Sequence, residues 1–214
     1  FNDNAFKSVV ALLMVASMPA GEASQFVAMA GALFILPFLT LSTAAGFVTD
    51  RFSKKKVIVA CKAAELALML LSLLALPGRN MPFLLALLFC LGAHSAFIGP
   101  AKLAILPEIL DDGDLSHGNG LMQMAVFLAI ILGTLVSGLL SAYAPPAAAG
   151  VLFSLLAAAG LWLILLMPDT GARDPDRALP WNMIGQTWRD IRGLSAYPGV
   201  MQAVVGAAYF WFLG

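Results

Sequence analysis

Polar side chains that interrupt long apolar segments are the residues best placed to do chemistry in this sequence. They are Asn2, Asp3, Asn4, Lys7, His94 and Lys102. When an apolar segment spans a membrane, an ionisable group inside it costs roughly 2.5–3.5 kcal/mol, so the group usually faces the bundle interior or water and has a partner. These residues therefore predict a polar cavity between helices rather than positions that face lipid.

The same residues also allow a structural interpretation. Asp3 and Lys7 are one helical turn apart and can form an i,i+4 ion pair. Asp3 can instead pair with Lys102 and hold two helices together. His94 can be an interior histidine whose hydrogen bonds are satisfied by its neighbours. An ion pair that opens and closes between two conformations serves both purposes, so the two interpretations overlap.

Two further features of the apolar segments concern helix geometry. Lys62 and Glu65 are three residues apart, which predicts a structural ion pair on one helix. Gly99 and Pro100 precede Lys102, and a proline inside a helix removes a backbone donor. We expect this helix to kink or unwind just before the lysine.

The run GFVTDRFSKKK, residues 46–56, places one acid and four bases between two apolar segments. Its candidate functional residues are Gly46, Asp50, Arg51, Lys54 and Lys55. The glycine permits close approach of helices, and the aspartate can face a helix N-terminus or a basic partner. The basic side chains can meet anionic lipid headgroups. The alternative for the lysines is an ordinary anchor that holds a basic loop on the cytoplasmic side.

The composition indicates an integral membrane protein built from helices. Hydrophobic residues make up 61% of the 214 residues and charged residues 11%, whereas soluble domains are about a quarter charged. Several apolar runs are long enough to cross a hydrocarbon core of roughly 30 Å. The net charge is zero, which gives no case for binding nucleic acid. Cys61 and Cys90 have neither a metal-ligand nor a CxxC spacing.

Six predicted transmembrane helices precede the longest polar segment. They cover residues 1–18, 26–48, 57–76, 82–106, 121–143 and 147–167. Arginine and lysine concentrate in the loops after the second and sixth of these helices. Because basic loops are held on the cytoplasmic side, we expect the 2–3, 4–5 and 6–7 loops to be cytoplasmic.

The predicted domain organisation has three parts. A six-helix transmembrane bundle covers residues 1–167, a cytoplasmic connector covers 168–197, and the start of a seventh, truncated span covers 198–214. The connector holds Trp181, Ile184, Trp188 and Ile191 on one helical stripe. Such a stripe with arginines nearby is typical of an amphipathic helix at a membrane surface, and a flexible connector is the alternative.

The sequence contains no enzyme signature. GxSxG, P-loop, HExxH and zinc-ligand spacings do not occur, and neither histidine begins a His-x4-Asp acyltransferase motif. We therefore expect no catalytic residues, no cofactor and no metal site in this chain.

GFVTDRFSKKK is similar to the signature of the major facilitator superfamily, in which a glycine, three residues, Asp-Arg and a basic cluster occupy the cytoplasmic loop between the second and third helices. The resemblance implies an all-α, polytopic membrane protein, of which this chain forms the N-terminal six-helix bundle of a twelve-helix fold plus the start of helix 7. It also implies that the signature holds a cytoplasmic gate in one state and releases it in the other.

FNDNAFK, IGPAKLAILPEIL and LSHGNGLMQ together resemble the bacterial lysophospholipid transporter branch of that superfamily. This resemblance implies a protein of the bacterial inner membrane that moves lysophospholipid, and lysophosphatidylethanolamine in particular, from the outer to the inner leaflet by alternating access. We expect the zwitterionic head of the lipid to meet Asp3, Asn4 and Lys102, carboxylate to ammonium and lysine to phosphate. Asn2, Lys7 and His94 complete the expected site, and membrane lipids surround it.

The branch resemblance also implies a partner, since some relatives are fused to, or work beside, an acyltransferase that re-acylates the imported lipid. Two other functions stay open. The gate signature is equally typical of an exporter of drugs or other amphiphiles. The chain could instead be a membrane anchor that docks a lipid-modifying enzyme without transport, although an anchor has no need of ionisable residues inside its spans.

Overall fold

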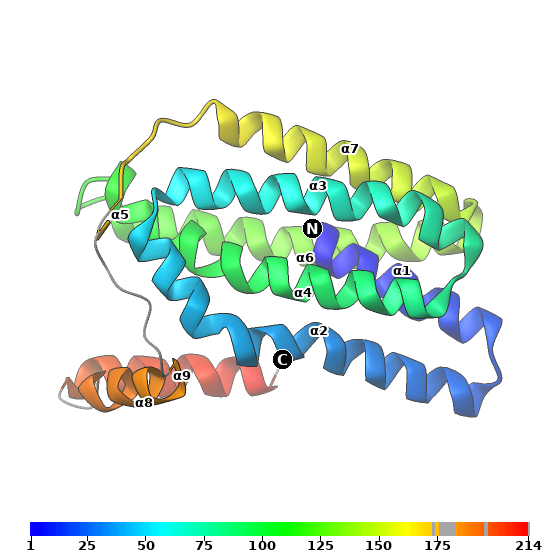
Figure 1. Cartoon of the computed structure of the whole chain (residues 1–214), viewed down its shortest axis with the longest axis horizontal. Coiled ribbons are helices and arrows are strands. Elements are labelled where there is room, and N and C mark those ends of the chain that lie inside the picture. The colour runs from blue at the N-terminus through cyan, green and yellow to red at the C-terminus, as the bar shows by residue number, and fades with distance from the viewer. Residues whose placement is uncertain (173, 176–182, 195–196, 214) are drawn as a thin grey trace. The chain divides into compact units, whose positions relative to one another are not determined.

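The computed structural model describes every residue except 173, 176–182, 195–196 and 214, and every regular element in the described residues is an α-helix (Figure 1). The helices are α1 (Asn2–Ser17), α2 (Ala20–Arg51), α3 (Lys54–Gly78), α4 (Met81–Ala104), α5 (Leu106–Ile109), α6 (Leu115–Tyr143), α7 (Pro146–Leu165), α8 (Met183–Leu194) and α9 (Pro198–Leu213). The chain divides into two compact units, Phe1–Arg177 with α1 to α7 and Ala178–Gly214 with α8 and α9.

The predicted all-α membrane fold is confirmed. Five segments in the described part of the chain are long and apolar enough to cross a membrane, namely α2, α3, α4 with α5, α6 and α7. α1 has 16 residues and spans about 24 Å at 1.5 Å per residue. α8 lies within the predicted connector. Trp188 is exposed on α8, whereas Trp181 and the side chains of Ile184 and Ile191 lie outside the described residues.

The expected unwinding of the fourth predicted helix does not occur. α4 runs through Gly99 and Pro100 without a break and ends at Ala104. Asn80 caps the start of this helix, because its Oδ1 accepts a hydrogen bond from the backbone N–H of Phe83 at 3.1 Å. Pro100 lacks the backbone N–H that would bond to the carbonyl oxygen of Ala96, so α4 continues through the proline with one intrahelical hydrogen bond fewer.

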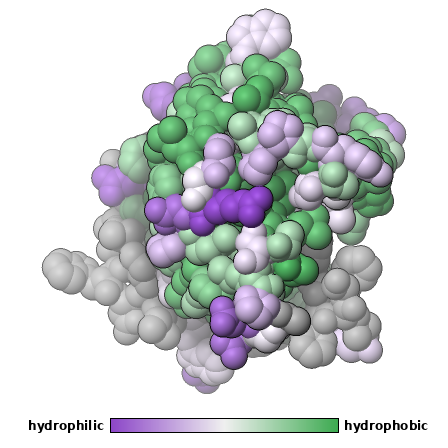
Figure 2. All heavy atoms as spheres, turned by 90° about the vertical axis from the view of Figure 1, so that its right-hand side faces the viewer, coloured by the Kyte–Doolittle hydropathy of each residue, from purple (hydrophilic) through white to green (hydrophobic). Residues whose placement is uncertain are grey.

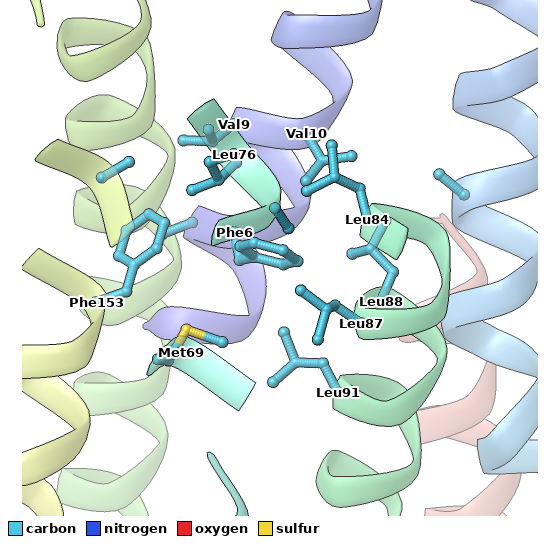
Figure 3. Close-up of a cluster of buried hydrophobic side chains, with 14 of the residues drawn as sticks. Phe6, Val9, Val10, Met69, Leu76, Leu84, Leu87, Leu88, Leu91 and Phe153 are labelled. Carbon is cyan, nitrogen blue, oxygen red and sulfur yellow. The ribbon is translucent and has the colours of Figure 1, made fainter. Parts of the chain in front are cut away.

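The centre of the first unit is an apolar core contributed by α1, α3, α4 and α7 (Figure 3). Phe6 of α1 is fully buried and meets the ring of Phe153 of α7 edge-on, with 6.4 Å between the ring centroids. Figure 3 shows Met69 of α3 and the leucines of α4, Leu87 and Leu91 among them, around the same ring. α1 therefore contributes a fully buried ring to the middle of this core.

The sides of the bundle remain apolar where they are exposed. Large hydrophobic residues such as Leu39 of α2, Ile131 of α6 and Leu155 of α7 lie at the surface. Figure 2 shows the end of the bundle that carries the α1–α2, α3–α4 and α6–α7 turns, where hydrophilic residues form a few patches and hydrophobic residues cover most of the rest. An exposed apolar surface of this extent requires lipid or further protein as its surroundings.

α2 and α4 are in backbone contact at one glycine. A Cβ atom placed on Gly92 of α4 would lie 2.2 Å from the carbonyl oxygen of Phe34 of α2, so no side chain fits there. Small residues at helix crossings allow such close approach within a membrane. The spacing of α2 and α4 therefore depends on Gly92.

We expect Gly92→Ala to destabilise the protein because the added methyl group must push α2 away from α4. Overpacking of this kind costs about 1–3 kcal/mol. Gly31→Ala is the matched control, since it lies within α2, the other helix of this contact, and its Cβ would meet no described atom of another helix within 4 Å. The measurement is the temperature at which half of the detergent-solubilised protein leaves the monodisperse peak in size-exclusion chromatography. Equal temperatures for the two variants would contradict the expectation.

Candidate functional site

A cavity of about 410 Å³ lies among α1, α3, α4, α5, α6 and α7. Its polar lining residues are Asn2, Asp3, Lys62, Glu65, His94 and Lys102. The rest of the wall is apolar and includes Phe1 and isoleucines of α3, α4 and α7. Small-molecule pockets in proteins range over roughly 300–1,000 Å³, so this cavity has the size of a ligand site.

Asp3 is the carboxylate that faces the open part of the cavity. It accepts a hydrogen bond from Ser95 Oγ of α4, and its side chain is 32% exposed. The hydrogen bond ties the start of α1 to the middle of α4. Because a third of the side chain is accessible, Asp3 can still bind a cation that enters the cavity.

Glu65 is the second carboxylate, and it is almost completely buried. It accepts hydrogen bonds from Asn2 Nδ2 at 2.8 Å and from Lys62 Nζ at 2.7 Å. Asn2 Nδ2 also donates to the carbonyl oxygen of Phe153 at 3.1 Å. Glu65 of α3 thus bonds to Asn2 of α1, and Asn2 in turn bonds to α7.

The sequence predicted the Lys62–Glu65 ion pair, which is confirmed, but it did not place these residues in the site. An ion pair inside an apolar span is itself unusual. Two ionisable residues one turn apart in such a span need a polar surrounding, and this need could have indicated the cavity.

His94 lies between the two carboxylates and contradicts the interpretation of an interior histidine with satisfied hydrogen bonds. Both ring nitrogens are buried, and neither has a hydrogen-bond partner among the described residues. Nδ1 lies 3.9 Å from Asp3 Oδ1, and Nε2 lies 3.7 Å from Glu65 Oε2. Both distances exceed that of a hydrogen bond. The imidazole is therefore held between two acceptors without a direct bond to either.

Asn4 and Lys7 do not line the cavity. Asn4 Nδ2 donates to Thr134 Oγ1 at 2.8 Å and to the carbonyl oxygen of Ile130 at 3.0 Å, both on α6. Residues two positions apart on a helix differ by about 200°, so Asn4 faces away from Asn2, which lines the cavity together with Asp3. Lys7 Nζ lies 5.5 Å from the centroid of the Phe34 ring of α2, and the expected ion pair with Asp3 is absent. Lys7 binds the ring face rather than the carboxylate.

The ionisable groups of the cavity are balanced in charge. Two acids, Asp3 and Glu65, face two bases, Lys62 and Lys102, with His94 between the acids. Lys102 forms no ion pair of 4.0 Å or less with Asp3, so the alternative of a structural pair between these two residues is also wrong in this structure. The cavity keeps one accessible acid and one separate base for a ligand.

Lys54, the first residue of α3, does not have the expected environment. Its side chain is 1% exposed, and Nζ lies 2.5 Å from Glu108 Oε1 of α5. Glu108 also accepts a hydrogen bond from Thr170 Oγ1, which follows α7. The expectation that Lys54 meets lipid headgroups is wrong, because the lysine is buried and pairs with Glu108 of α5.

The other residues of the GFVTDRFSKKK run have separate environments. Lys55 Nζ donates to the carbonyl oxygen of Leu165 at 3.1 Å, and the Arg51 guanidinium lies 5.8 Å from the Phe47 ring centroid. The carbonyl oxygen of Asp50 accepts from the backbone N–H of Asp174 at 3.0 Å. A Cβ atom on Gly46 would meet no described atom within 4 Å, so the expected close helix approach at this glycine is not found within the described chain.

Asp169 fastens the segment after α7 to the start of α3. Ser53 Oγ donates a hydrogen bond to its carboxylate, and the Gly171 N–H donates another at 3.1 Å. These bonds, that from Ser53 above all, hold the pKa of the exposed Asp169 carboxyl below its usual value. The stabilisation is present above the unfolded-state pKa and is lost as the pH falls through the lowered pKa of the folded state.

Comparison with known proteins identifies a family to which this chain is similar. The model of the Major Facilitator Superfamily matches residues 5–214. A lysophospholipid transporter LplT from Cronobacter sakazakii is 33% identical over 157 residues, which cover 73% of this chain and 36% of that protein. Proteins of the same name from Yersinia pestis and Yersinia pseudotuberculosis are 29% identical over 181 residues, 85% of this chain and 43% of theirs. The chain thus spans less than half the length of these relatives.

We expect Glu108→Gln to destabilise the fold because it leaves the ammonium group of Lys54 buried without a counter-charge. Breaking a buried ion pair on one side costs about 3–5 kcal/mol, and the partial exposure of Glu108 places this pair at the lower end. Lys56→Gln is the control, since this exposed lysine should contribute within about 0.5 kcal/mol. Thermal unfolding of the purified protein checks both. A Glu108→Gln variant as stable as Lys56→Gln would show that Lys54 is not buried as a charge.

Proposed function

This chain belongs to the major facilitator superfamily, and on that premise we propose that the protein transports a lysophospholipid across the lipid bilayer. The proteins named lysophospholipid transporter that resemble this chain support the substrate class. The preferred substrate is lysophosphatidylethanolamine, a single-chain lipid whose head carries one phosphate and one primary ammonium group.

The observation that carries the proposal is the balance of charge in the cavity. Asp3 presents an accessible carboxylate on α1, and Lys102 presents a separate ammonium group on α4. A zwitterionic head needs one group of each sign, carboxylate for its ammonium and lysine for its phosphate. Asn2, Glu65 and His94 surround these two residues, while Asn4 and Lys7 are no longer assigned to the site.

Transport follows from alternating access, in which the bundle formed here rocks against the remainder of the protein around the cavity. We place the cytoplasmic gate at the α2–α3 turn, with Asp50, Arg51 and the Lys54–Glu108 pair as its residues. The direction is from the outer to the inner leaflet of the inner membrane. A separate acyltransferase activity would then restore the second acyl chain.

The experiment that tests the function follows radiolabelled lysophosphatidylethanolamine in spheroplasts that lack their own lysophospholipid uptake. The full-length protein is expressed, the lipid is added outside, and its appearance as inner-leaflet or re-acylated lipid is measured. Uptake above that of cells without the protein supports the proposal. Well-folded protein that gives no uptake but exports dyes or drugs would identify the amphiphile exporter, and a protein with neither activity would indicate the anchor.

In the same assay, Asp3→Asn and Lys102→Gln should each lower uptake at least tenfold, because each removes a charge that pairs with the head group and is worth about 1.5–3 kcal/mol. Asparagine can still accept the hydrogen bond from Ser95, so the fold should persist. Glu22→Gln neutralises an exposed acid in the first turn of α2 and should leave uptake unchanged. Normal uptake by both cavity variants would remove the site assignment.

A further inference from the structure

His94 has an unusual position for a histidine, because both of its nitrogens face carboxylate oxygens. Nδ1 points toward Asp3 and Nε2 toward Glu65, at 3.9 and 3.7 Å. More than nine-tenths of the residue is buried, and within the described part of the chain neither nitrogen has a hydrogen-bond partner. The three residues come from α4, α1 and α3.

The protonation states of histidine explain why a neutral ring cannot form hydrogen bonds to both carboxylates here. A neutral imidazole has one N–H donor and one lone pair, so one of its nitrogens always turns a lone pair toward a carboxylate. An imidazolium ion has two donors and can bond to both carboxylates after a shift of less than 1 Å from the distances seen here. The surroundings of His94 therefore fit the protonated ring.

The other charged groups around His94 are compatible with a proton on its ring. Lys62 already neutralises Glu65, whereas Asp3 has only the hydroxyl of Ser95 and the imidazole beside it. Lys102 lines the same cavity, and the thiol of Cys61 borders an apolar cavity that His94 also lines. The ionisable residues of α2 lie in its end turns, and α7 has none.

A ligand ammonium group must use the same carboxylate. Asp3 is the accessible acid of the cavity, and its Oδ1 is the atom that faces His94 Nδ1. A cation bound to this oxygen would lie within a few ångströms of the imidazolium, and two like charges at that distance repel strongly where water is scarce. The two cations therefore exclude one another.

From this geometry we propose that His94 holds an exchangeable proton between Asp3 and Glu65, and that the ammonium group of a bound zwitterionic lysophospholipid displaces it. The ammonium group takes the place of the proton beside Asp3, the proton leaves His94 for water, and the phosphate of the same lipid meets Lys102. The inference rests on the proposed function and adds a regulation of the same site, in which acidification weakens the binding of ammonium-bearing lipid.

Calorimetric titration of the purified full-length protein tests this exchange. Lysophosphatidylethanolamine is titrated between about pH 5 and pH 8 in two buffers of different ionisation enthalpy, which gives the number of protons released. We expect release that approaches one proton per lipid at low pH, with affinity that falls up to about tenfold per pH unit of acidification. Lysophosphatidylglycerol with the same acyl chain has no ammonium group, so its binding should release no proton.

His94→Gln is the decisive variant. It should bind lysophosphatidylethanolamine without proton release and with little dependence on pH, and its binding of lysophosphatidylglycerol reports that it is folded. Proton release equal to that of the unmodified protein would place the proton on a carboxylate and overturn the proposal. If the variant does not fold, the binding of the two lipids to the unmodified protein still tests the proposal. Equal pH dependence of the two affinities would contradict the exchange. Failure of both lipids to bind overturns the proposed function itself.

Discussion

The arrangement of the bundle depends on how it accommodates buried charge. Glu65 lies within an apolar helix, where an unpaired carboxylate would be too costly to keep ionised. Lys62 supplies its counter-charge and Asn2 its second donor, and Asn2 also reaches the backbone of α7. These contacts fix the start of α1 against α3 and α7, and this position in turn places Asp3 beside Ser95 and His94 of α4. The cavity is a consequence of this network.

Much of the fold could be predicted from hydropathy, because apolar runs near the membrane thickness have few alternative structures. The ends of the helices could not be predicted in this way. α2 extends on both sides of the predicted residues 26–48, because polar residues continue a helix where water replaces lipid. For the site, the polar residues inside apolar segments pointed to Asn2, Asp3, His94 and Lys102, and the structure places these four at one cavity. The sequence assigned Asn4 to the site although the helical period turns it about 200° away from Asn2. The position of Glu65 required knowledge of which face of α3 meets α1.

The basic run between α2 and α3 shows why a charge cluster cannot be interpreted as a unit. Three consecutive lysines look equivalent in the sequence, yet Lys54 is enclosed, Lys55 reaches a helix carbonyl and Lys56 is exposed. The difference arises because successive residues at a helix start point in directions about 100° apart. Only Lys54 points toward α5, where Glu108 makes burial of the charge tolerable. The segment after α7 closes over the same end through Thr170 and Asp169.

The polar contacts of α1 also have a consequence for biosynthesis. Asn2 bonds to Glu65 and to the backbone of Phe153, 63 and 151 positions later, and Asn4 bonds to Ile130, 126 positions later. At about 5–20 residues per second, Phe153 is made roughly 8–30 s after Asn2. Glu65 itself follows Asn2 by roughly 3–13 s, and for that time the amides of α1 have none of these partners, and lipid offers no substitute. The first helix must therefore wait beside the insertion machinery or at the membrane surface until the later helices arrive, and it completes its insertion together with them.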